Sequence, residues 1–241
     1  MHLLKVNSGS LLFYNIELIN ARSLKNKIHE LHYKLSHNLD IVCITETWLN
    51  LSISNSVIVS DINFSIYRKD QVGNREGGGV CILTNNASVL VDPVNLPAKY
   101  LSLELIVVDN VSREPQHECF RLFVAYRPPC NSDSDPNSVI YTTLLCECIE
   151  SLYPINSTIV LCGDFNFPRI NWSSNNNVFT NANSCSGVFI NFFYKHALTQ
   201  FVASPTRLSD QSGNGSLLDL VVCNDPNFVF NTNVDAPFGS S

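Results

Sequence analysis

Short, almost purely apolar runs that end in a polar residue place the strongest constraint on what this chain can fold into. Residues 40–46 read DIVCITE, and residues 157–164 read STIVLCGD. Runs of this length, rich in β-branched residues, predict buried strands. Because a rigid sheet holds side chains firmly at its strand ends, ligand crevices of open α/β sheets lie there. The polar residues that end these runs are therefore the first candidates for a functional site.

Other segments predict further strands and a smaller number of helices. The predicted helix at 24–35 has apolar residues at three-to-four spacing, and Ser23 is a candidate for its cap. Because helices fall between several strands without strict alternation, we expect an α/β sandwich with helices outside packed sheets. Further strands are expected at 11–19, near 64–67, at 80–84 after a Gly-Gly-Gly turn, and at 100–109, 120–126 and 217–223, with further helices at 138–152 and 188–196.

Composition favours one globular domain. Apolar residues make up 45% of the 241 residues and charged residues 15%, which provides enough material for a buried core. No internal repeat, low-complexity tail or linker divides the chain, so we expect a single domain over 1–241. The net charge of -6 disfavours a protein that coats nucleic acid, but it allows an enzyme that touches a few phosphates and holds a cation in an acidic pocket.

The cysteines and the N-terminus restrict the cellular compartment in which the protein is expected. The nine cysteines include no C-x-x-C pair, and Cys43, Cys81 and Cys162 lie inside apolar runs, so reduced and buried thiols are expected. Cys146 and Cys148 form C-x-C on a predicted helix, where packing is favoured over metal binding. No signal peptide is evident, and no apolar segment approaches the ~18 residues needed to span a bilayer, so we expect a soluble intracellular protein without a membrane partner.

Each strand-end residue has an ordinary explanation when it is taken alone. Glu46 could be a solvated turn carboxylate, Asp164 and Asn166 could form an Asx turn, and Tyr126 could serve packing. Asp219 lies inside the apolar run LLDLVV, where an unpartnered carboxylate would be costly to bury. A buried carboxylate beside a cleft often orients a histidine or binds a cation.

Taken in order, these segments resemble the endonuclease/exonuclease/phosphatase superfamily, which has the DNase-I-like fold. The finer wording is similar to the endonuclease domains of LINE-type, Jockey-like non-LTR retrotransposons. The match consists of N-A-R-S-L at 20–24, I-T-E-T-W-L at 44–49, G-G-G-V at 77–80, Y-R-P-P at 126–129, G-D-F-N at 163–166, S-P-T-R at 204–207 and S-L-L-D-L-V at 216–221.

The resemblance implies a fold and a metal. The fold would be a four-layer sandwich of two packed mixed β-sheets with helices on the outer faces, its last strand region incomplete. Glu46 would be the main protein ligand of Mg²⁺, or of Mn²⁺ as an alternative, and Asn20 would lie close to the metal. Mg²⁺ prefers oxygen ligands and keeps several waters, so one or two carboxylates suffice.

The resemblance also implies catalytic roles. Tyr126 would bond a phosphate oxygen, Asp164 would position or deprotonate the attacking water, and Asn166 would hold the phosphate as charge develops. Asp219 would fix the tautomer of a catalytic histidine. Family domains end in S-D-H, whereas this sequence stops at Ser241, and none of its six histidines is a suitable replacement. We therefore expect a domain lacking its C-terminal end, which folds but cleaves poorly.

The implied substrate is chromosomal DNA, nicked on one strand in the nucleus to prime a reverse transcriptase encoded downstream. Arg22, Arg127 and Arg207 lie near the motifs and are candidate contacts to DNA phosphates, and residues 204–216 form a candidate DNA-contacting loop. Two alternatives stay open. One is a phosphatase acting on a small phosphoester, and the other is an inactive fragment of a mobile element.

Overall fold

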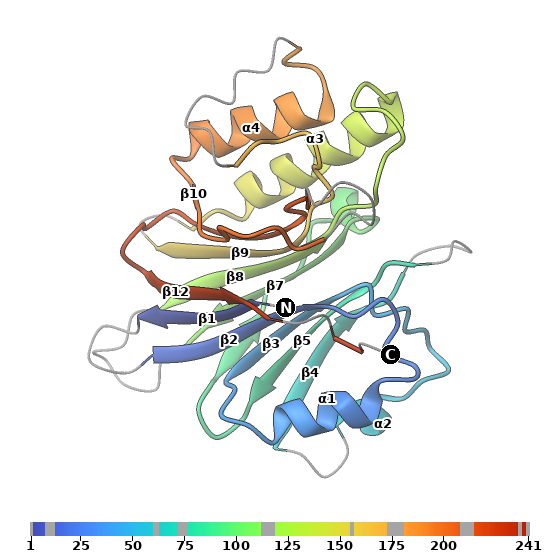
Figure 1. Ribbon diagram of the computed structural model, residues 1–241, viewed down its shortest axis with the longest axis vertical. Helices are drawn as coiled ribbons and strands as arrows, with labels where there is room; N and C mark the ends of the chain where they lie inside the picture. The colour runs from blue at the N-terminus through green and yellow to red at the C-terminus, as the bar shows by residue number, and fades with distance from the viewer. Residues whose placement is uncertain are drawn as a thin grey trace.

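The computed structural model contains two six-stranded mixed sheets that stack face to face, with helices on both outer faces (Figure 1). The described residues are 2–7, 13–59, 63–71, 77–111, 119–154, 157–172, 181–207, 215–235 and 238–239. The predicted fold class, a four-layer α/β sandwich, is confirmed.

The first sheet has the strand order β12-β1-β2-β3-β5-β4. Strands β2 and β3 run parallel, and the other neighbours run antiparallel. The helices α1 and α2 lie on its outer side (Figure 1). The elements are β1 (His2–Asn7), β2 (Phe13–Asn20), α1 (Ile28–Leu35), β3 (Ile41–Thr45), α2 (Asn55–Val59), β4 (Phe64–Lys69), β5 (Val80–Asn85) and β12 (Val229–Val234).

The second sheet has the order β10-β11-β9-β8-β7-β6, with a parallel pair formed by β8 and β9. The helices α3 and α4 cover its outer face (Figure 1). The elements are β6 (Val91–Pro93), a 3₁₀ turn (Ala98–Tyr100), β7 (Glu104–Asn110), β8 (Phe120–Tyr126), α3 (Pro136–Ser151), β9 (Thr158–Asp164), α4 (Cys185–Lys195), β10 (Thr199–Gln200) and β11 (Asp219–Cys223).

Three apolar layers follow from the side-chain alternation of the strands. On β2, Ile16 and Leu18 face the second sheet, whereas Ile19 faces α1. Between the sheets, these residues meet others such as Val124 and Cys162. A third layer fills the space between the second sheet and the helices α3 and α4.

Helix starts follow the local sequence. Asp135 caps α3 by accepting a hydrogen bond from the Ser138 amide at 2.8 Å, and Ser184 caps α4 by accepting one from the Gly187 amide at 3.1 Å. The expected Ser23 cap is wrong, because α1 begins only at Ile28. The backbone before it is held instead by the end of β3, where the Leu24 amide donates to the Thr47 carbonyl at 2.9 Å.

All nine cysteines are free, and seven of them are buried, as the apolar runs predict. Burial raises the pKa of Cys81 to about 12 and the pKa of Cys148 to about 11, so these thiols stay protonated near neutral pH. Within the described ranges, none of the helices has the length and apolar character needed to cross a membrane.

Candidate active site

In the first sheet, the parallel pair brings Asn20 and Glu46 to the same edge. Asn20 ends β2 and pairs with Thr45, which ends β3 and directly precedes Glu46. Parallel strands end at the same side of a sheet, so the two predicted metal-site residues lie side by side.

In the second sheet, the same geometry brings three predicted residues together. Tyr126 and Asp164 end the parallel strands β8 and β9 opposite each other. Antiparallel β11 begins at Asp219, which pairs with Asp164. The sequence placed Asp219 in the interior of a strand, and this is wrong, because it is the first residue of its strand and lies at the rim.

One hydrogen bond joins the two groups across the sandwich. The side-chain amide of Asn20 donates to Asp164 Oδ2 at 2.8 Å, although the residues are 144 positions apart. The sequence-predicted residues of both sheets therefore converge at one edge of the molecule.

Asp164 is the buried centre of this edge. Burial raises the pKa of its carboxyl group well above the ordinary value, and the negative charges of Asp219 and Glu46 raise it further. The Asn166 amide, which donates to Asp164 Oδ1 at 3.2 Å, acts in the opposite direction. The negative charges of these carboxyl groups therefore act on one another at this edge.

Asp219 is held by a residue that the sequence reasoning did not single out. Burial raises its pKa, the Thr206 hydroxyl opposes that shift, Glu46 adds to it, and the exposed Arg22 opposes it. Thr206 Oγ1 also accepts bonds from the Leu218 and Asp219 amides at 3.0 and 3.1 Å. The S-P-T-R segment contains Thr206 and was the available signal.

Glu46 lies in a turn with a left-handed backbone. Its φ is +51°, and that of Trp48 is +53°. The Trp48 indole donates to Glu46 Oε2 at 3.3 Å, and the Trp48 amide donates to the Gly78 carbonyl at 3.0 Å. A Cβ atom at Gly78 would collide with the buried Glu104 carboxylate, so only glycine fits there.

Left-handed backbone is concentrated at this edge. Of six non-glycine residues with positive φ in the described chain, five are at or next to the predicted site. Such conformations cost free energy, persist where the surroundings hold them, and cluster at functional sites. The five are Arg22, Ser23, Glu46, Trp48 and Asn166, and the sixth is Ala197.

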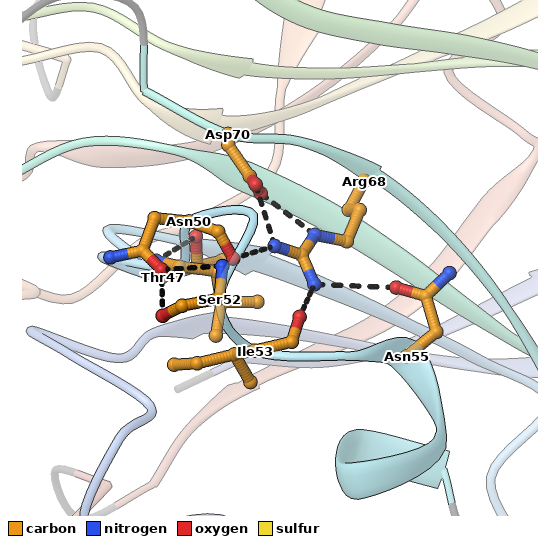
Figure 2. A network of polar contacts seen from close by, with 8 residues as sticks. Thr47, Asn50, Ser52, Ile53, Asn55, Arg68 and Asp70 are labelled. Carbon is orange, nitrogen blue, oxygen red and sulfur yellow. Dashed lines mark hydrogen bonds and ion pairs between the residues drawn. The ribbon is translucent and has the colours of Figure 1, made fainter.

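The segment after Glu46 and Trp48 is fixed by Arg68 of β4 (Figure 2). The Arg68 guanidinium donates to the carbonyls of Asn50 and Ile53 at 2.7 and 2.6 Å, and it pairs with Asp70 at 2.6 Å. Leu51 at the tip of this loop is 98% exposed. The loop that follows the Glu46 turn is therefore rigidly anchored, although its tip faces solvent.

The buried position of Arg127 contradicts its prediction as a DNA contact. Its side chain is 1% exposed and bonds to protein groups. Arg22 and Arg207, in contrast, are exposed. Arg207 forms a bridge with Ser216 at the base of the candidate DNA-contacting loop, and residues 208–214 of that loop lie outside the described residues.

Tyr126 is buried, with its ring packed in the layer between the two sheets. Its carbonyl accepts a hydrogen bond from the Tyr141 hydroxyl at 3.1 Å, and that hydroxyl also accepts from the Glu104 amide at 3.1 Å. Contact between Tyr126 and a phosphate stays a prediction.

The donor set fits a hard divalent cation. Asn20 Oδ1 and Asp219 Oδ1 are buried without a hydrogen-bond partner, which a bound ion and its waters would satisfy. Over the described ranges no group of three His, Cys, Asp or Glu side chains could hold a metal. The free oxygens at this edge belong to one carboxylate and one amide, and Mg²⁺ prefers oxygen donors and keeps several waters of its own.

The hydrogen bonds of the described residues join no histidine to Asp219. His32 lies 2.9 Å from the Ile58 carbonyl oxygen, and His196 pairs with Glu150 at 3.0 Å. His117 lies outside the described residues.

Comparison with known families now decides the assignment. The family model described as endonuclease-reverse transcriptase matches residues 120–241, which contain Tyr126, Asp164, Asn166 and Asp219. The chain belongs to this family. The resemblance to the endonuclease/exonuclease/phosphatase superfamily is thereby confirmed.

Solved structures show that this endonuclease family member shares its fold with DNA-processing enzymes. The 3′ phosphatase NExo from Neisseria, bound to a product DNA hairpin, is 15% identical with a TM-score of 0.63 and covers 86% of this chain and 85% of its own. The AP endonuclease LMAP from Leishmania major is 15% identical with a TM-score of 0.66, and the match covers 87% of this chain and 78% of that protein. D. rerio TDP2 with a single-strand DNA product is 11% identical with a TM-score of 0.55, over 86% and 82%. No curated protein matches the sequence.

Proposed function

We propose that this protein is a Mg²⁺-dependent phosphodiesterase that nicks DNA. The observation that carries the proposal is the Asn20–Asp164 hydrogen bond at 2.8 Å, because it brings the acidic residues of the two sheets together at one edge. Beside that bond, Asn20 Oδ1 and Asp219 Oδ1 lack partners. Unsatisfied oxygens next to mutually repelling carboxylates are what a cation would stabilise.

The residues divide the chemistry between them. Glu46 and Asn20 would hold Mg²⁺, or Mn²⁺ in its place, and the ion would neutralise the charge that develops on the scissile phosphate. The raised pKa of Asp164 makes it a better proton acceptor for the attacking water than an ordinary carboxylate. Asn166 would donate a hydrogen bond to the phosphate.

DNA is the proposed substrate. Two of the similar structures contain product DNA, which is a property of those proteins and supports the proposal here. The exposed Arg22 and Arg207 flank the site and could contact backbone phosphates. In the finer proposal, the nick is made in chromosomal DNA in the nucleus, and its 3′-hydroxyl primes a reverse transcriptase of the same retrotransposon.

We also propose that turnover is slow, because no described histidine bonds to Asp219. A general acid–base group typically contributes about 10²- to 10⁴-fold. Added imidazole should therefore raise the nicking rate of the protein, and an unchanged rate would contradict this part of the proposal.

The deciding experiment follows conversion of supercoiled plasmid to nicked circles with Mg²⁺, with Mn²⁺ and with EDTA. Asp164→Asn serves as the inactive control. Phosphate release from inositol phosphates and nucleotides is followed in parallel. Nicking that requires metal and Asp164 is expected. Phosphate release without nicking would favour the phosphatase alternative, and neither activity would favour an inactive mobile-element fragment.

A further inference from the structure

Arg127 is a buried cation placed directly behind the predicted phosphate-binding residue. It follows the last residue of β8, is 1% exposed, and is the largest of the fully buried side chains. The guanidinium group is charged at all ordinary pH values, so burying it requires several bonds to acceptors.

The contacts of its side chain include two carbonyls of the G-D-F-N loop, Thr142 of α3 and the Cys130 thiol, to which Nη2 donates at 3.5 Å. Nη1 donates to the Asn166 and Phe165 carbonyls at 3.1 and 3.4 Å, and Nε donates to Thr142 Oγ1 at 2.9 Å. The guanidinium carbon lies 4.3 Å from the ring centre of Phe167. Among the ion pairs of the described ranges, none includes Arg127. Carbonyl oxygens and an aromatic face therefore balance its charge, and both come from the G-D-F-N loop and the residue after it.

The backbone of Arg127 completes a reciprocal clamp. Its amide donates to the Asp164 carbonyl at 2.8 Å, and its carbonyl accepts from the Asn166 side-chain amide at 2.8 Å. Asn166 is thus gripped at both its carbonyl and its side chain, while its backbone has a φ of +50°.

We propose that Arg127 is a positioning residue that orients the Asn166 amide toward the substrate phosphate. This inference rests on the proposed function. An amide group is planar, so once one N–H is bonded to the Arg127 carbonyl, the direction of the second N–H is fixed. A donor held in this way need not reorient when charge develops on the phosphate. Phosphate contact, predicted for Arg127 from sequence, is made instead by the residue that it holds.

The test compares Arg127→Lys with Arg121→Lys. Arg127→Lys keeps the charge and the backbone carbonyl but loses the planar fork that holds the Phe165 and Asn166 carbonyls, and therefore the position of Asn166 against that backbone carbonyl. Arg121 is a matched control on β8, the strand that precedes Arg127; it is paired with Asp109 at 2.6 Å and bonded to the Leu152 carbonyl, away from the site. Thr142→Val is a milder variant that removes the Nε acceptor and keeps the arginine. The first readout is the ¹⁵N side-chain amide signals of Asn166, assigned by their loss in Asn166→Asp.

We expect Arg127→Lys to shift or broaden the Asn166 signals, Thr142→Val to do so to a smaller extent, and Arg121→Lys to leave them unchanged. In plasmid nicking, Arg127→Lys should lower kcat by about tenfold or more with KM changed less than about threefold. In an Asn166→Ala background it should have little further effect, because the two residues act as a unit.

Unchanged Asn166 signals in folded Arg127→Lys and Thr142→Val would overturn the proposal, as would a full effect of Arg127→Lys in the Asn166→Ala background. If Arg127→Lys does not fold, Thr142→Val decides. A wild-type protein that does not nick DNA refutes the proposed function, while the Asn166 signals still test the clamp.

Discussion

The two sheets supply different kinds of residue to the same edge. Asp164, Asn166 and Asp219 of the second sheet are buried and bonded to neighbouring backbone or hydroxyl groups. Asn20 and Glu46 of the first sheet are half-buried. We infer that the second sheet provides a fixed catalytic frame, whereas the first provides the more open side that receives the metal ion.

The largest expected effect tests the fixed frame. Asp164→Asn keeps the shape and removes the proton acceptor, so kcat for nicking should fall by about 10²- to 10⁴-fold. Asp109→Asn, at the far end of the second sheet, is the matched control and should leave kcat near the wild-type value. Equal loss in both variants would show that the effect arises from folding.

A smaller effect is expected on the open side. Glu46→Gln removes the charge of the main predicted ligand, so the Mg²⁺ concentration for half-maximal nicking should rise by at least ~10-fold. Mutating a residue that only supports a metal ligand already lowers metal affinity by about that factor. Metal titration of the nicking rate measures this. An unchanged half-saturating Mg²⁺ concentration with a reduced kcat would show that Glu46 acts in the fixed catalytic frame and not as a metal ligand.

The coupling between the two sides predicts a pH dependence. The pKa values of Asp164 and Asp219 are raised in the fold. Each of these two groups contributes to the free energy of unfolding. That contribution is fully present below the ordinary pKa near 3.8 and is lost as pH rises through the raised pKa of the folded protein. A cation that binds the carboxylates opposes this loss, by about 2.7 kcal/mol at a hundred times Kd.

The increase in Tm on adding Mg²⁺ should therefore be larger at pH 8 than at pH 5, and smaller in Asp164→Asn, as measured by calorimetry. An increase that does not depend on pH would place the ion elsewhere.

The smallest expected effect is one on stability, and it comes from Arg68, which anchors the loop after the Glu46 turn. Arg68→Ala should lower the free energy of unfolding by about 1–3 kcal/mol, because carbonyls and a carboxylate lose a charged donor. Urea unfolding measures this. Leu51→Ser in the same loop is the control and should stay within about 0.5 kcal/mol, since the side chain is exposed.

The convergence of five site residues could be predicted because they lie at the ends of or within apolar runs that indicate strands, and because their order along the chain resembles a known family: Asn20, Glu46, Asp164, Asn166 and Asp219. The sequence reasoning missed β1 and β12, in which apolar residues are mixed with polar ones such as Lys5, Asn7, Asn231 and Asn233. Strands with this mixture of polar and apolar residues lack the continuous apolar signal of a strand that is buried on both faces.

Arg127 was misassigned for a different reason. A charged residue after a strand can point outward or inward, and only the partners decide. Here those partners are Thr142 of α3 and the Asn166 carbonyl, 15 and 39 residues further along the chain. The hydrogen bond from the Gly79 amide to the Glu104 carboxylate links the segment before β5 to β7 in the same way, and no local pattern indicates it.

The position of β1 between β12 and β2 has a consequence for biosynthesis. Strand β1 leaves the ribosome before β12, and the two strands pair from His2 with Val234 to Val6 with Val229. Until β12 is made, one side of β1 presents unpaired backbone groups, which are a template for association with other chains. A chain released after Cys223 should therefore sediment as oligomers, and a monodisperse monomer would show that nascent β1 is protected by other means.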